Sequence, residues 1–143
     1  MLYPYMLYVG REILHQASLC HPFIIQLFEA FLTPQHLAIV MEYADVGSLL
    51  AYQQAQPGRR LSEGTTRWLF QQLVIGLDYA HQRGVSNRDL KLENLMLCRN
   101  GGPEAQAADR PLLKIGDFGY SKHVGAAVAA QSVVEQIGHG RTC

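Results

Sequence analysis

The longest regular pattern of hydrophobic positions lies in the middle of the chain and predicts an α-helix. Between Ser62 and Gly84, apolar residues recur every three or four positions, as one side of a helix requires. Serine is favoured immediately before a helix, and glycine immediately after one. We therefore expect a helix from Ser62 to Gly84 whose apolar residues are Leu69, Leu73, Leu77 and Ala80, flanked by Trp68, Phe70 and Val74.

Shorter patterns before this helix predict a hairpin and a helical piece. Residues 24–32 and 37–43 are runs rich in isoleucine, phenylalanine and valine, which are typical of strands. Residues 33–36 contain threonine and proline and suit the turn between the two strands. After this antiparallel hairpin, residues 49–54 predict a short helix.

Two further apolar runs follow the long helix and predict a second hairpin. They are Leu95–Cys98 and Leu112–Ile115, and the polar residues 99–110 join them. This loop is longer than the roughly two to five residues that are usual in a hairpin loop. Residues 125–131 are mostly alanine, valine and glycine, and we expect this tail to be poorly ordered.

Composition and charge narrow the classes of protein. The chain has 143 residues, 48% of them hydrophobic and 17% charged, which fits one globular domain. Twelve basic residues balance twelve acidic ones. The chain therefore lacks the excess positive charge that is typical of proteins binding nucleic acid or anionic lipid. The apolar residues 1–9 lack a basic start and are shorter than the roughly 20 residues of a spanning helix. Three cysteines without a C-x-x-C pair suit a reducing compartment, and we expect a cytoplasmic or nuclear protein.

The candidate chemistry lies in Asn87-Arg-Asp-Leu-Lys-Leu-Glu-Asn94 and in Asp117-Phe-Gly119. Taken singly, an aspartate or asparagine in a polar loop is usually a turn former. Nine letters of these two motifs match the catalytic loop and the metal-binding triplet of eukaryotic protein kinases, at about one chance in twenty each, which is roughly once in 10¹¹ to 10¹² placements. The chain therefore resembles a protein kinase.

The resemblance implies a role for four of these residues. Asp89 would be the base that orients the incoming hydroxyl, and Lys91 would offer its ammonium to the transferring phosphoryl group. Asn94 and Asp117 would supply the oxygen ligands that Mg²⁺ prefers. The implied cofactors are ATP and Mg²⁺.

The resemblance also implies an ATP-binding region upstream. Residues 37–44 resemble the fifth strand and the hinge, with Met41 at the back of the pocket and Glu42 to Ala44 facing the adenine through backbone groups. Met96 falls where kinases place an apolar side chain under the ring, although plain core packing is equally compatible with both methionines.

Residues 11–19 have near-helical spacing and resemble the helix whose glutamate pairs with the ATP-anchoring lysine in kinases. Glu12 would be that glutamate. On its own, a glutamate on a helix is more often a solvated charge.

Lys91 in the catalytic loop favours a serine/threonine kinase over a tyrosine kinase. Residues 32–44, 70–79 and 113–122 resemble the osmotic-stress and abscisic-acid-activated, sucrose-nonfermenting-related kinases of plants and green algae. This wider resemblance covers residues 11–122.

The implied fold is α+β, part of the bilobal protein kinase fold. We expect one incomplete domain over residues 1–143, with the small-lobe remainder and hinge at about 9–44. The start of the mainly helical large lobe would occupy 45–122, and a truncated activation segment 123–143.

The chain also departs from the kinase pattern. Nothing before Arg11 resembles the glycine-rich loop or the ATP-anchoring lysine. Asn87 takes the usual histidine position, where it can bond to backbone but loses the ring contact with Phe118, and Gln16 stands at an often apolar position. We expect both substitutions to weaken activity.

Three functions are therefore open. The first is phosphoryl transfer from ATP to serine or threonine of protein substrates, with a regulatory protein as a further partner. The second is an inactive, pseudokinase-like or decoy module that offers a kinase surface for binding. The third is a truncated gene product, which would expose the apolar side of the long helix. Nucleic acid and membrane are not expected partners.

Overall fold

The computed structural model describes residues 13–99, 110–117 and 122–123. Residues 13–17 are helical, as predicted. The following elements are, in chain order, β1 (Leu27–Leu32), β2 (Leu37–Met41), β3 (Gly47–Ser48), α2 (Leu49–Gln54), the 3₁₀ turn η1 (Pro57–Arg59), α3 (Glu63–Gln82), β4 (Val85–Ser86), the 3₁₀ turn η2 (Leu92–Asn94), β5 (Leu95–Cys98), β6 (Leu112–Ile115) and β7 (Lys122–His123).

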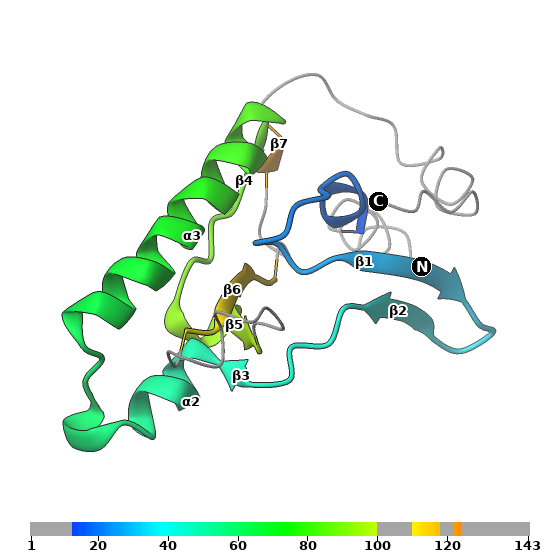
Figure 1. Cartoon of the computed structure of the whole chain (residues 1–143). Coiled ribbons are helices and arrows are strands. Elements are labelled where there is room, and N and C mark those ends of the chain that lie inside the picture. The colour runs from blue at the N-terminus through cyan, green and yellow to red at the C-terminus, as the bar shows by residue number, and fades with distance from the viewer. Residues whose placement is uncertain (1–12, 100–109, 118–121, 124–143) are drawn as a thin grey trace.

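The strands form three small antiparallel sheets, and α3 runs along one side of them (Figure 1). The hairpin β1–β2 lies on the opposite side, and the sheet β3-β5-β6 lies between the hairpin and α3. The pair β4–β7 lies at the end of α3. This mixture of helices and antiparallel strands confirms the predicted α+β class.

The long helix forms where it was predicted. The hydroxyl of Ser62 accepts a hydrogen bond from the backbone N–H of Thr65 and caps the start of α3. At the other end Gly84 has a φ of +73°, a conformation that glycine adopts without strain. The two terminal residues therefore set the length of α3.

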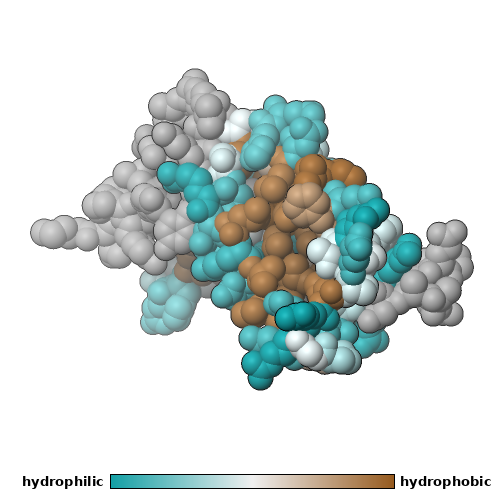
Figure 2. All heavy atoms as spheres, turned by 90° about the vertical axis from the view of Figure 1, so that its left-hand side faces the viewer, coloured by the Kyte–Doolittle hydropathy of each residue, from teal (hydrophilic) through white to brown (hydrophobic). Residues whose placement is uncertain are grey.

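The side of α3 that faces the core differs in part from the predicted one. Leu69 and Ala80 are buried as expected, and Gln72 and Gly76 are buried with them. The outward side carries Phe70, Val74 and Ile75, which are exposed. Figure 2 shows apolar side chains gathered on this face of the molecule.

The first hairpin is confirmed, but β1 begins three residues later than predicted and β2 ends two residues earlier. Leu27 pairs with Met41, and the backbone N–H of Thr33 closes the turn on the carbonyl of His36 at 2.7 Å. Ile25 donates its N–H to the carbonyl of Ile115 at 3.0 Å and so joins β6. Ile24 and Ile25, which precede β1, are therefore buried against β6 and do not belong to the hairpin.

The core lies between α3 and the sheet β3-β5-β6. Its buried residues come from segments far apart in the sequence: Leu19, Ile24, Leu49, Leu69, Ala80, Val85, Leu95, Leu97, Leu113 and Ile115. Within the described ranges, none of the helices is both long enough and apolar enough to cross a membrane.

Candidate active site

The second hairpin brings the two predicted motifs together. Leu95 and Ile115 are direct partners in the antiparallel pair β5–β6. Asn94 immediately precedes β5, and Asp117 follows β6 by two positions, so both lie at the same end of the sheet. The backbone N–H of Gly116 donates to the carbonyl of Asn94 at 2.9 Å and fixes this meeting point.

Asp89, Lys91 and Asn94 form one cluster of side chains. The Oδ2 atom of Asp89 accepts a hydrogen bond from Nδ2 of Asn94 at 2.9 Å, and it lies 3.3 Å from Nζ of Lys91. The side chain of Asp89 is 27% exposed and that of Lys91 is 50% exposed. The carboxylate is thus held in place, whereas the ammonium can reorient toward a bound group.

The orientation of Asn94 suits a role as a cation ligand. Its Nδ2 group donates to both the carbonyl and the Oδ2 atom of Asp89, at 2.9 Å each. The amide oxygen Oδ1 is therefore the atom directed toward a cation, as the hard Mg²⁺ ion requires. The carboxylate of Asp117, the other predicted ligand, is exposed, so the two residues would offer Mg²⁺ one amide oxygen and one carboxylate.

No three His, Cys, Asp or Glu side chains gather into a metal site anywhere in the described part of the chain.

Asn87 links the two motifs directly. Its Oδ1 atom accepts the backbone N–H of Asp89 at 2.9 Å, and its Nδ2 group donates to the backbone carbonyl of Asp117 at 3.2 Å. The expected hydrogen bond from asparagine to backbone is therefore present. The predicted ring contact involves Phe118, which lies outside the described residues.

The predicted hinge residues connect the first hairpin, β1–β2, to the sheet β3-β5-β6. Met41 ends β2 and is 49% exposed. Ala44 is buried, and its carbonyl accepts the N–H of Gly47 at 3.3 Å, which starts β3. Because Ser48 of β3 pairs with Met96 of β5, the hinge exit lies beside the strand that carries the predicted floor of the pocket.

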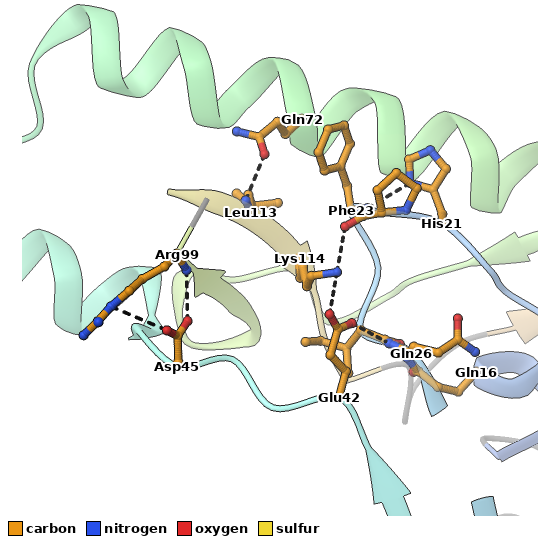
Figure 3. Close-up of polar contacts among 12 residues, drawn as sticks. Gln16, His21, Phe23, Gln26, Glu42, Asp45, Gln72, Arg99, Leu113 and Lys114 are labelled. Carbon is orange, nitrogen blue, oxygen red and sulfur yellow. Dashed lines mark hydrogen bonds and ion pairs between the residues drawn. The ribbon is translucent and has the colours of Figure 1, made fainter. Parts of the chain in front are cut away.

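The side chain of Glu42 points toward Lys114 of β6 (Figure 3). Its Oε1 atom lies 2.8 Å from Nζ of Lys114, and its Oε2 atom accepts the N–H of Gln26 at 3.2 Å. Lys114 also donates to the carbonyl of Pro22 at 2.9 Å. Any contact of Glu42 with adenine is thus left to its backbone carbonyl, since its N–H donates to Gln26.

Two buried polar residues that support the site were not among the predicted ones. Lys114 is 9% exposed and Gln72 is 3% exposed. Gln72 accepts the N–H of Leu113 at 3.0 Å and donates to the carbonyl of Pro111 at 3.4 Å, so it ties α3 to β6 (Figure 3). A polar residue inside an apolar run was the available signal, because such residues need buried partners.

The two remaining sequence expectations have different outcomes. Glu12 lies outside the described residues, so its predicted pairing stays a prediction. Gln16 is buried, and its amide donates to the carbonyl of Ile25, which satisfies the polar group inside the core.

Comparisons with known proteins show the family of the chain. Residues 7–138 match the family described as protein kinase domain. The chain is 51% identical to serine/threonine-protein kinase SRK2H of Arabidopsis thaliana over 114 residues, which are 80% of this chain and 29% of that protein. It is 48% identical to serine/threonine-protein kinase SAPK9 of Oryza sativa subsp. japonica over 114 residues, with the same shares of 80% and 29%.

The predicted likeness to plant serine/threonine kinases is therefore confirmed. The chain spans less than a third of the length of these relatives.

Proposed function

Since this chain belongs to the protein kinase domain family, we propose that its site supports transfer of the γ-phosphoryl group of ATP to serine and threonine hydroxyls of proteins. The observation that carries the proposal is the hydrogen-bonded cluster of Asp89 and Asn94, joined through Gly116 to Asp117. It gathers a base and two oxygen ligands at one end of the sheet.

In the proposed reaction, Asp89 receives the proton of the substrate hydroxyl. Because Oδ2 of Asp89 already contacts Asn94 and Lys91, Oδ1 is the oxygen directed to that hydroxyl. The hydroxyl oxygen bonds to the γ-phosphorus while the bond from that phosphorus to the bridging oxygen breaks, and ADP leaves with the electron pair. Lys91 turns from Asp89 to the transferring group and balances its charge.

Mg²⁺, when bound by Asn94 and Asp117, would neutralise the phosphates. The carbonyl of Glu42 and the backbone of Ala44 would bind the adenine, with Met96 beneath it. From the membership in this family, we propose that residues at about 9–44 belong to the small lobe and hinge, that residues 45–122 begin the large lobe, and that residues 123–143 belong to the activation segment.

The experiment is a calorimetric titration of the 143-residue protein with ATP, with and without Mg²⁺. The sequence has a hinge and both metal ligands, but no segment resembling the glycine-rich loop or its lysine. Losing a charge-assisted contact of this kind costs about 1.5 to 3 kcal/mol, or roughly 10- to 150-fold in affinity. We expect binding in the high micromolar to millimolar range that Mg²⁺ strengthens.

Asp117→Ala should abolish the effect of Mg²⁺. The matched control is Asp78→Ala, because Asp78 is an exposed carboxylate on α3 whose side chain accepts a hydrogen bond from Gln82, and this change should leave the effect intact. Sub-micromolar binding, or binding that is indifferent to both Mg²⁺ and Asp117, would show that the site has been misassigned.

A further inference from the structure

The residue that departs most clearly from the kinase pattern, Asn87, occupies a central place in the structure. We propose that Asn87 is a positioning residue, whose single side-chain amide holds the base Asp89 and the metal ligand Asp117 at one spacing. The proposal deepens the proposed function and rests on it. It also replaces the expectation that asparagine is a defect at this position.

The two contacts of Asn87 have opposite polarity. The oxygen end of the amide accepts the N–H of Asp89, and the nitrogen end donates to the carbonyl of Asp117, thirty positions further along the chain. Both partners are backbone groups, so the contacts orient the chain at each motif. A side chain at this place must therefore accept at one end and donate at the other.

The backbone of Asp117 adopts an unusual conformation. Its φ is +49°, in the left-handed region, which costs a residue other than glycine on the order of 1 kcal/mol or more. Such a conformation persists when surrounding contacts hold it. Within the described contacts, Asn87 holds the carbonyl of Asp117, and Asn94 holds the preceding N–H of Gly116. The direction of the Asp117 carboxylate follows from that backbone conformation.

The contacts of Asn87 do not depend on its protonation. The asparagine amide does not change its charge with pH, so both contacts persist at any pH at which the fold persists.

The test compares three variants of the 143-residue protein by the factor by which Mg²⁺ strengthens ATP binding. Asn87→Asp keeps an acceptor for Asp89 and loses the donor to Asp117. Asn87→Leu loses both contacts and adds no charge, so the two together separate geometry from electrostatics. We expect each to reduce the Mg²⁺ factor about tenfold, while binding without Mg²⁺ changes little, because the hinge is intact.

Ser62→Ala is the control for stability alone. It removes the cap of α3 and should lower the unfolding temperature without changing the Mg²⁺ factor.

A second measurement decides the proposal without nucleotide. In NMR spectra of the free protein, Asn87→Asp should shift the carbonyl carbon of Asp117 while hydrogen exchange at the N–H of Asp89 stays slow. Asn87→Leu should shift the carbonyl and also speed that exchange. If the unchanged protein shows no Mg²⁺ factor, the proposed function fails, and these spectra still judge the contacts of Asn87. Variants with an unchanged carbonyl shift or an unchanged Mg²⁺ factor would overturn the proposal.

Discussion

At the scale of single residues, the polar groups inside the fold all have identifiable partners. Among the described residues, no buried side-chain nitrogen or oxygen atom lacks a hydrogen-bond partner. The most consequential of these groups is Lys114, whose ammonium contacts Glu42 from the hinge and Pro22 from the segment before β1. One buried charge thus connects the hinge to the strand that leads to Asp117.

Removing one member of this ion pair should destabilise the protein strongly. Lys114→Met leaves the carboxylate of Glu42 without its cation, and the side chains are only 11% and 26% exposed. Breaking such a pair costs about 3 kcal/mol, since the remaining charge stays largely out of water. Urea denaturation should show this loss in the free energy of unfolding.

The matched control for the ion pair is Arg99→Met. Arg99 pairs with Asp45 at 3.5 Å, but its side chain is 83% exposed, so the loss should stay below about 1 kcal/mol. Equal losses for the two variants would contradict the importance of burial. The double variant Lys114→Met with Glu42→Leu should recover part of the stability, because no charge is then left buried.

His21 should make the stability depend on pH. Its Nδ1 atom accepts the N–H of Phe23 at 3.1 Å, which requires a neutral ring. Burial lowers the pKa of His21, and the positive charges of Lys114 and Arg83 lower it further. The unfolded chain therefore binds this proton more readily, and the contribution of His21 is present above about pH 6.5 and is lost as the pH falls below it.

Thermal unfolding between about pH 7.5 and about pH 5.5 checks this sign. The unfolding temperature should fall on acidification, and less so in His21→Asn, whose side-chain oxygen can accept the same N–H without titrating. An unchanged slope in that variant would assign the pH dependence to other groups.

At the scale of elements, the packing of α3 on β6 holds the site's sheet in place. Trp68 and Gln72 both donate to the carbonyl of Pro111, at 3.0 and 3.4 Å. One turn further, Gly76 allows close approach, because a Cβ atom there would lie 3.0 Å from Cδ1 of Ile115 and 3.2 Å from the carbonyl of Phe23. The helix therefore touches β6 through its backbone as well as its side chains.

Two glycine substitutions in α3 should have opposite effects. Alanine favours a helix interior by up to about 1 kcal/mol over glycine, so Gly64→Ala, which meets only the Ser62 hydroxyl at 4.0 Å, should be neutral or stabilising. Gly76→Ala should destabilise by about 1 to 3 kcal/mol, because the backbone of Phe23 cannot move aside cheaply. Circular dichroism of urea unfolding measures both, and a stabilising Gly76→Ala would show that the helix does not pack as described.

At the scale of the whole molecule, the site is assembled from both hairpins, the hinge and the loop after α3. The exposed face of α3, with Phe70, Val74 and Ile75, lies on the side away from this assembly (Figures 1 and 2). The proposed catalytic residues and the apolar face can therefore be altered separately.

We predict that the 143-residue protein by itself transfers no phosphate to peptide substrates at steady state. The sequence has the base and the metal ligands but nothing that resembles the parts covering and anchoring the phosphates, and positioning supplies most of the catalysis in phosphoryl transfer. An assay with radiolabelled ATP measures it. Transfer that Asp89→Asn abolishes would contradict this prediction and would show that residues 1–143 suffice.

Local sequence patterns determined several features correctly. The ends of α3, the strands β5 and β6, and the spacing of the motifs follow from residues close together in the chain. Capping, turn formation and strand alternation act over a few positions, so a sequence shows them directly. The roles of Asp89, Asn94 and Asp117 stay predictions, and the structure shows that these residues lie together.

Other features depended on residues that only folding brings together. Ile25 bonds to β6 and does not belong to its predicted strand, and Gln72 is buried in the core. Lys114 contacts Glu42, which lies 72 positions earlier in the chain. The two contacts of Asn87 belong to the same class. Each is a choice between partners of similar chemistry, and tertiary structure decides it because burial penalises every polar group that is left without one.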